Sequence, residues 1–205
     1  MALSSAMPIH WVIQTMSRGH GLQAVVKCSR KSLVPILGIS ADGSTIVGHD
    51  YANRFAIRVR NNEVERLAAN GRAYSASEDG STVVGTSPAP VGNPQASLWD
   101  FSGTRTLLHQ RTQEFNTEGR VISRDGSTAI GFGRRAGGRF SFAIWNRDGS
   151  RRFTQDTDTL PSGAVSQDGS IVYTTLGSST QTLHRYTANE RPCGPRSLIS
   201  RGLRL

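Results

Sequence analysis

A five-residue phrase, Ser-x-Asp-Gly-Ser, occurs four times in this sequence and limits the fold more than any other feature. Its copies begin at Ser40, Ser77, Ser123 and Ser166. They recur at intervals of 37, 46 and 43 residues, close to the roughly 40–45 residues of a four-stranded propeller blade. A helical repeat of this length would instead show apolar residues three and four positions apart. The chain therefore builds one structural unit several times.

The phrase itself predicts a tight turn between two strands. Gly adopts a positive φ without steric cost, and Asp accepts hydrogen bonds from the backbone of its own turn. A short β-rich run follows each copy, and after a variable loop comes a strand with alternating apolar residues, such as 55–60. The residues expected to form these structural turns are Asp42, Gly43, Asp79, Gly80, Asp125, Gly126, Asp168 and Gly169.

Each unit divides into four expected strands. In the second unit the first strand ends at Ser40, and the others cover 45–48, 55–60 and 64–67. In the later units the third strand is expected at 96–101, 140–146 and 181–187. The fourth strand of the fifth unit is expected at 196–199. The first 37 residues lack the phrase, but 11–13, 24–28 and 32–37 fit the frame as its last three strands.

The predicted fold class is therefore all-β. We expect one repeat domain over residues 1–205, folded as a β-propeller or propeller-like array of about five four-stranded blades, in a complete or partial ring. The five units are expected at residues 3–37, 39–69, 73–108, 120–153 and 164–200.

The charge of the chain bears on its partners. It carries 24 Lys and Arg against 15 Asp and Glu, a net charge of +9, which favours association with polyanions. No aromatic residues are interleaved in an RNA-binding arrangement, which argues against nucleic acid. An anionic glycan or protein surface stays open as partner, although scattered cations also keep sheet edges from pairing. The arginines expected to contact an anionic ligand are those of the variable loops: Arg111, Arg120, Arg134, Arg135 and Arg139.

The sequence predicts no cofactor and no metal site. The five histidines lack metal-ligand spacing, and the four repeated Asp residues should lie one blade apart, too far to share a cation. Trp99 and Trp145 occupy the same place in their strands. Their indoles either pack as wedges between blades or form an exposed platform for a ligand.

Cysteine usage and the chain start give little about location. Cys28 and Cys193 fall in the first and last units, where they either staple a closed ring or stay unpaired. No apolar run is long enough for a membrane span, and the first residues do not read as a signal peptide. The protein is therefore expected to be cytoplasmic or to begin inside a longer gene.

Several of these runs resemble the HAF-type extracellular repeat of bacterial proteins. The resemblance lies in residues 39–48 followed by 55–58, in 77–85 followed by 96–99, and in 142–145. It implies a propeller-like array on secreted, surface or autotransporter-like proteins, and hence an extracellular or cell-surface location. The family offers no catalytic residues to carry over. This chain differs by lacking a secretion signal and by having Arg185 where the repeat has Trp.

Three functions remain open on the sequence. The first is a non-catalytic surface or extracellular repeat scaffold and binding module. The second is a propeller-type hydrolase or lyase with a site at the channel mouth, for which His109, Glu114 and Glu118 form the only cluster of suitable side chains. The third is a truncated fragment of a longer secreted or autotransporter protein, which the irregular first unit favours.

Overall fold

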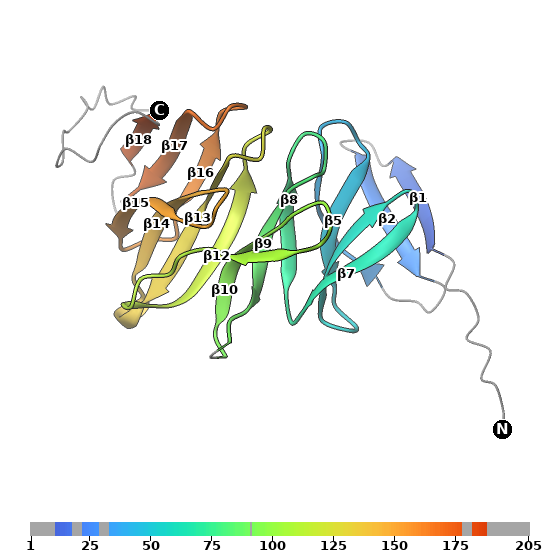
Figure 1. Ribbon diagram of the computed structural model, residues 1–205, viewed down its shortest axis with the longest axis horizontal. Helices are drawn as coiled ribbons and strands as arrows, with labels where there is room; N and C mark the ends of the chain where they lie inside the picture. The colour runs from blue at the N-terminus through green and yellow to red at the C-terminus, as the bar shows by residue number, and fades with distance from the viewer. Residues whose placement is uncertain (1–10, 18–21, 29–32, 91, 178–181, 188–205) are drawn as a thin grey trace.

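The computed structural model describes residues 11–17, 22–28, 33–90, 92–177 and 182–187, with side chains described from residue 35 onward. These residues form five antiparallel sheets that lie side by side (Figure 1). Within each sheet, strands that follow one another in the sequence are paired. No described segment is a helix long and apolar enough to cross a membrane.

The bounds of the strands are as follows. Sheet 1 contains β1 (Trp11–Ser17), β2 (Leu22–Cys28) and β3 (Leu33–Val34). Sheet 2 contains β4 (Ile36–Ile39), β5 (Thr45–Asp50), β6 (Phe55–Arg60) and β7 (Glu63–Ala69). Sheet 3 contains β8 (Arg72–Ala76), β9 (Val83–Pro88), β10 (Pro94–Trp99) and β11 (Arg105–Leu107). Sheet 4 contains β12 (Glu114–Ile122), β13 (Thr128–Arg135), β14 (Phe140–Asn146) and β15 (Arg151–Thr157), with the 3-10 turn η1 (Ala136–Gly138) between β13 and β14. Sheet 5 contains β16 (Ser162–Val165), β17 (Ile171–Leu176) and β18 (Thr182–Thr187).

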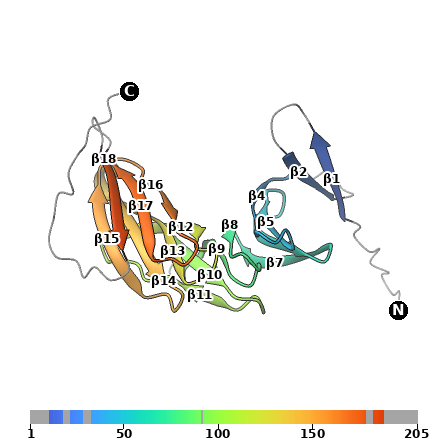
Figure 2. The same ribbon diagram turned by 90° about the horizontal axis from the view of Figure 1, so that it is seen from above.

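The sheets are arranged as an open arc. Figure 2 shows sheets 1 and 5 at opposite ends, with the first strands β4, β8, β12 and β16 along the concave side. These first strands contact one another in succession. The all-β, propeller-like array predicted from the phrase is therefore confirmed, in the form of a partial ring.

Some predicted strand boundaries were wrong. The strand expected at 32–37 is two strands in different sheets, because Pro35 separates β3 from β4. The fourth unit begins at Glu114 rather than at residue 120. Residues 114–120, including Arg120, therefore belong to β12 and not to a variable loop. By contrast, β6 and β14 have the predicted bounds. The expected strand at 196–199 and the possible partner of Cys28, Cys193, lie outside the described residues.

All four copies of the phrase form the same turn. In the second copy, Ser77 N donates to Thr82 O (2.8 Å) and Gly80 N donates to Ser77 O (3.1 Å). The Ser77 hydroxyl donates to Asp79 Oδ1 (2.8 Å) and accepts from Thr82 N (3.0 Å), while Asp79 Oδ1 also accepts from Ser81 N (2.9 Å). The turn glycines have φ values between 65° and 73°. The predicted structural role of the repeated Asp and Gly residues is therefore confirmed.

Successive turns are also joined to each other. Asp42 N donates to Glu78 O (3.1 Å), and Glu78 N donates to Arg124 O (2.8 Å). The last link runs from Asp125 N to Gln167 O (3.0 Å). A line of backbone hydrogen bonds therefore runs from sheet 2 to sheet 5 through the turns.

The turn glycine is needed for close packing as well as for its backbone conformation. A Cβ atom at Gly80 would overlap the hydroxyl of Thr45 in the preceding sheet. One at Gly169 would overlap the side chain of Thr128, and one at Gly126 would lie 3.0 Å from Thr82 Oγ1. The Asp-Gly turns of sheets 3, 4 and 5 are thus pressed against the start of the preceding sheet's second strand.

The core lies between the faces of neighbouring sheets. Trp99 is 0% exposed and packs in a cluster with Val47 and Ala56 of sheet 2. Trp145 is equally buried, packs in a cluster with Leu98 of sheet 3, and donates its Nε1 hydrogen to His109 O at 2.8 Å. The prediction of wedge packing between blades is confirmed, and neither indole is an exposed platform.

The fifth unit keeps this arrangement with a different residue. Trp99 is paired with Val83, and Trp145 is paired with Ala129. Val83 and Ala129 each lie four residues after the aspartate of their turn. The same place in sheet 5, opposite Val172, holds Tyr186. The expectation that Arg185 replaces the tryptophan was wrong, because the register places Arg185 one position earlier.

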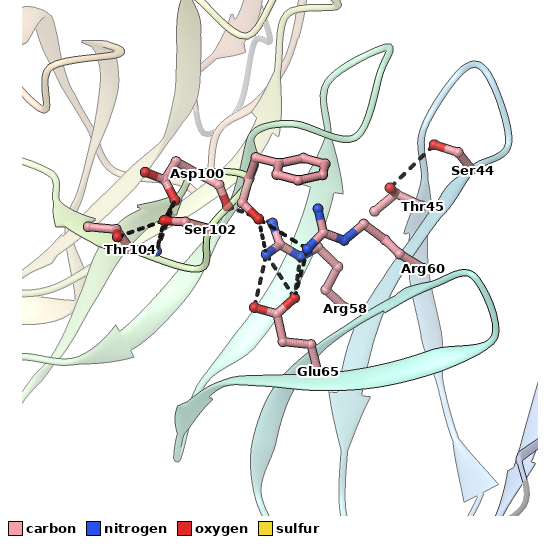
Figure 3. Close-up of polar contacts among 9 residues, drawn as sticks. Ser44, Thr45, Arg58, Arg60, Glu65, Asp100, Ser102 and Thr104 are labelled. Carbon is pink, nitrogen blue, oxygen red and sulfur yellow. Dashed lines mark hydrogen bonds and ion pairs between the residues drawn. The ribbon is translucent and has the colours of Figure 1, made fainter.

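A buried arginine of sheet 2, ion-paired to Glu65 in its own sheet, clamps sheet 2 to sheet 3 (Figure 3). The side chain of Arg58 is 0% exposed, and its Nε and Nη2 donate to the two carboxylate oxygens of Glu65 at 2.9 Å each. Its remaining donors reach the turn of the next sheet, at Asp100 O (2.6 Å) and Phe101 O (2.9 Å). The positions equivalent to Arg58 in sheets 3 and 4 hold Leu98 and Ile144, so the clamp is specific to this junction.

Two glycine substitutions separate backbone strain from the turn contact. Gly43 has φ +73° with no described atom within 4 Å of an added Cβ, so Gly43→Ala should cost about 1–2 kcal/mol of unfolding free energy. Gly80→Ala adds the clash with Thr45 and should cost roughly 2–5 kcal/mol. Urea unfolding followed by circular dichroism measures both. Equal losses for the two variants would show that the packing of turn on sheet contributes nothing.

The Arg58 clamp can be tested by removing one partner and then both. Glu65→Ala leaves a buried guanidinium with only carbonyl partners, and should cost about 1–3 kcal/mol because Glu65 is itself 35% exposed. The double variant Arg58→Leu/Glu65→Leu replaces the ion pair by an apolar cross-strand pair, like Ile144 and Phe153 at the equivalent place in sheet 4, and its exposed turn carbonyls can bind water instead. We expect the double variant to be more stable than the single one in urea unfolding. A double variant that is less stable by more than about 1 kcal/mol would contradict this account.

Candidate ligand-binding site

Four of the five arginines expected to bind an anion gather at one end of sheet 4. We call this group the arginine tip: Arg111, Arg134, Arg135 and Arg139, with Asp156 and Asp158. Asp156 accepts from Arg111 (3.0 Å) and forms an ion pair with Arg135 (2.6 Å). Arg139 lies 3.5 Å from Asp158, with both side chains about two-thirds exposed or more (67% and 72%).

The local sequence explains this arrangement. Arg135 N donates to Arg139 O at 2.8 Å, which closes the loop from β13 to β14 around η1. Gly137 and Gly138 have positive φ values of 74° and 73° and no described atom within 4 Å of an added Cβ. The guanidinium of Arg134 lies 5.8 Å from the ring centre of Phe140. The tip therefore holds four guanidinium groups against two carboxylates on an exposed loop end.

Arg120 does not belong to the arginine tip. It lies on the inner strand β12, where it pairs with Glu118 at 2.7 Å and stacks over Tyr74 (4.3 Å) and Phe132 (5.2 Å). The arginine tip and Arg120 are therefore two separate cationic places.

A buried carboxylate supports the arginine tip from below. The Glu114 side chain is 0% exposed and accepts from both Nη atoms of Arg151 (2.6 and 2.9 Å), from the Ser141 hydroxyl and from Arg111 N (3.0 Å). Burial alone would raise the pKa of Glu114, but the hydrogen bonds from Arg151 and Ser141 outweigh it and lower this pKa. Glu114 is thus an ionised structural anchor that fixes the backbone of Arg111.

The residues of the alternative enzyme hypothesis do not share a pocket. His109 lines an open hollow of about 410 Å³ with residues 150–154, and neither Glu114 nor Glu118 lines it. Glu114 is bound to Arg151, while Glu118 accepts from the Tyr74 hydroxyl (3.3 Å) and from Arg120. Among the described residues, no three His, Cys, Asp or Glu side chains lie close enough together to hold a metal ion.

The turn aspartates are ionised and engaged within their own turns. Hydrogen bonds from the Ser166 hydroxyl and from the Ser170 backbone and side chain lower the pKa of Asp168 to about 2. The corresponding bonds also lower the pKa of Asp42 and of Asp79. For Asp125 burial opposes the shift, but hydrogen bonds from Ser123 and Ser127 still lower its pKa.

These pKa shifts predict acid sensitivity with a definite sign. Because the pKa of Asp168 is depressed in the folded state, its contribution to stability is present above about pH 4 and is lost as the pH falls to about 2. Ser166→Ala removes the main cause and should move the pKa of Asp168 towards 3.8. Titration of the Asp168 carboxyl carbon by NMR measures this pKa in both proteins. An unchanged pKa in Ser166→Ala would contradict the role given to the serine.

A second polar group, which the sequence did not predict, lies on the inner strands β8 and β12. It consists of Arg72, Tyr74, Glu118 and Arg120. Burial and the charge of Glu118 raise the pKa of Tyr74, while a hydrogen-bonding contact with Tyr74 raises that of Arg72. Tyr74 and Arg120 come from different repeat units. Only an alignment of β8 with β12, each placed relative to its Ser-x-Asp-Gly-Ser copy, could have suggested their contact.

Comparison with solved structures agrees with the fold. TolB from Acinetobacter baumannii superposes with a TM-score of 0.55 at 16% identity, over 87% of this chain and 49% of that one. A protein described as TolB from Agrobacterium tumefaciens gives 0.54 at 15% identity, over 79% of this chain and 61% of that one. A chain of a nidogen/laminin complex gives 0.50 at 16% identity, over 77% and 61%. No protein-family model and no curated protein sequence matches.

These likenesses define the class of the protein as β-propeller type and show the fold alone. The chain spans about half to three-fifths of the length of the structures it matches, at 49% and 61%. They add no functional residue to those found from the geometry.

Proposed function

We propose that this protein is a non-catalytic propeller-type scaffold and binding module whose arginine tip contacts an anionic partner. The observation that carries the proposal is the excess of guanidinium groups over carboxylates in an exposed loop, held on a buried Glu114–Arg151 anchor. Binding residues are commonly carried on loops that a rigid scaffold positions. Arg presents planar donors that suit carboxylate, sulfate or phosphate groups.

The charge of the whole chain supports the same proposal. A net charge of +9 attracts anions over a distance of about a Debye length, roughly 8–10 Å at physiological salt. The resemblance to the HAF-type repeat further supports a place on a secreted or cell-surface protein, within a longer array of the same repeat. An acidic protein surface or an anionic glycan would meet the tip at the rim of the arc where the β13–β14 loop lies.

The experiment compares two double variants with the same loss of charge. Arg135→Gln/Arg139→Gln changes the arginine tip, whereas Arg54→Gln/Arg66→Gln changes exposed arginines of sheet 2. Binding of a heparin hexasaccharide and of a poly-glutamate peptide is measured by calorimetry at low and high salt. We expect steep salt dependence, and a loss of about threefold to tenfold in affinity for the tip variant only.

Either of two results would contradict the proposal. Equal losses in both double variants would mean that only net charge attracts the probe. Affinity that does not change between low and high salt would mean that the arginines make no ionic contact with it.

A further inference from the structure

A hollow of about 280 Å³ lies where sheet 4 meets the chain that leads into sheet 5. Its floor is formed by apolar side chains of sheet 4 that are almost fully buried, and its other wall by the segment before β17. The residues that carry the argument are Ile130, Phe132, Phe142, Leu160, Pro161 and Gly163. The size suits one apolar side chain rather than a larger molecule, because whole-ligand pockets measure roughly 300–1,000 Å³.

A cation stands at the rim of this hollow. Arg120 lines it, and its side chain is 41% exposed. Its guanidinium carbon lies over the rings of Tyr74 and Phe132, 4.3 and 5.2 Å from their centres. A guanidinium has five N–H donors, so the single 2.7 Å contact with Glu118 Oε2 leaves donors for a second carboxylate. With Arg72 beside Tyr74, two guanidinium groups face one carboxylate here.

An exposed strand edge passes the same hollow. In the described sheet 5, β16 pairs only with β17 and forms the edge of the sheet. Its residues Ser162, Gly163 and Ala164 are all exposed, whereas no three consecutive residues are all exposed in the first strands of sheets 2 to 4. The unpaired backbone of such an edge can accept an extended peptide as an added strand.

We propose that these three features form a binding site for the C-terminal end of a peptide whose last residue is apolar. The last side chain enters the hollow, the terminal carboxylate pairs with Arg120, and the preceding residues extend along β16. A peptide terminus supplies an apolar group, an adjacent carboxylate and a row of backbone donors and acceptors together. The site is separate from the arginine tip and does not depend on the proposed function.

The test uses a fluorescein-labelled peptide, Gly-Ser-Thr-Ser-Leu, in two forms that end in a free carboxylate or in an amide. Fluorescence anisotropy measures the affinity of the whole chain for each form. We expect the amide to bind about tenfold more weakly, the effect of losing one charge-assisted contact. Arg120→Gln should weaken the acid about tenfold and leave the amide unchanged.

Variants at exposed residues test the hollow without disturbing the buried core. Leu160 is 54% exposed, so Leu160→Asp should keep the fold while making the hollow hostile to an apolar side chain. Leu183→Asp, at a residue 68% exposed elsewhere in sheet 5, is the matched control. We expect Leu160→Asp to weaken binding of the acid and Leu183→Asp to leave it unchanged, and circular dichroism checks the fold of each.

Several results would overturn the proposal. They are no binding of the acid form up to millimolar concentration, equal affinity for acid and amide, or equal losses in Leu160→Asp and Leu183→Asp. Binding of N-acetyl-leucine as tight as that of the peptide would also overturn it, since the strand edge would then have no part. Variants of the arginine tip should leave this affinity unchanged, so failure here is distinguishable from failure of the anion proposal.

Discussion

The backbone hydrogen bonds between successive Asp-Gly turns are the contact on which the arrangement of sheets 2 to 5 depends. Each link fixes the start of one sheet against the start of the next, as from Glu78 N to Arg124 O. A link of this kind requires turns of the same shape in sheets 2 to 5, and in sheets 3 to 5 the turn glycine also lets the threonine of the preceding sheet approach. The repeated phrase in the sequence is therefore a requirement of the junctions between sheets as much as of the turns themselves.

The same geometry places the loops of sheets 2 to 5 on two opposite rims of the arc. In a four-stranded meander, the turns after the first and third strands lie at one end of the strands. The loop after the second strand and the connection to the next sheet lie at the opposite end. The first rim is occupied by the linked turns, which leaves little freedom for variation. The opposite rim carries the η1 loop with the half-buried Arg135 and the exposed Arg139, and loop positions there are free to vary and to serve binding.

The sequence predicted the parts of the fold that depend on local patterns. The strand β6 was placed correctly because its apolar residues alternate, and β14 because a short apolar run lies between a glycine-rich loop and a turn. The start of β12 was missed because Glu114 and Glu118 read as loop residues. They are strand residues through pairing with β13, and their side chains are satisfied by Arg151 and Tyr74 from other strands. The inner polar group joins Tyr74 to Arg120 across two sheets, and no local pattern encodes that contact.

Hydrogen exchange of the turn amides tests the central claim most directly. The amides of Asp42, Glu78 and Asp125 donate to the next turn, whereas the amide of Ala52 donates only to the side chain of Asp50 within its own loop. We expect the three turn amides to exchange as slowly as amides inside the strands, and Ala52 to exchange much faster. Turn amides that exchange as fast as Ala52 would show that the sheets are not joined through their turns.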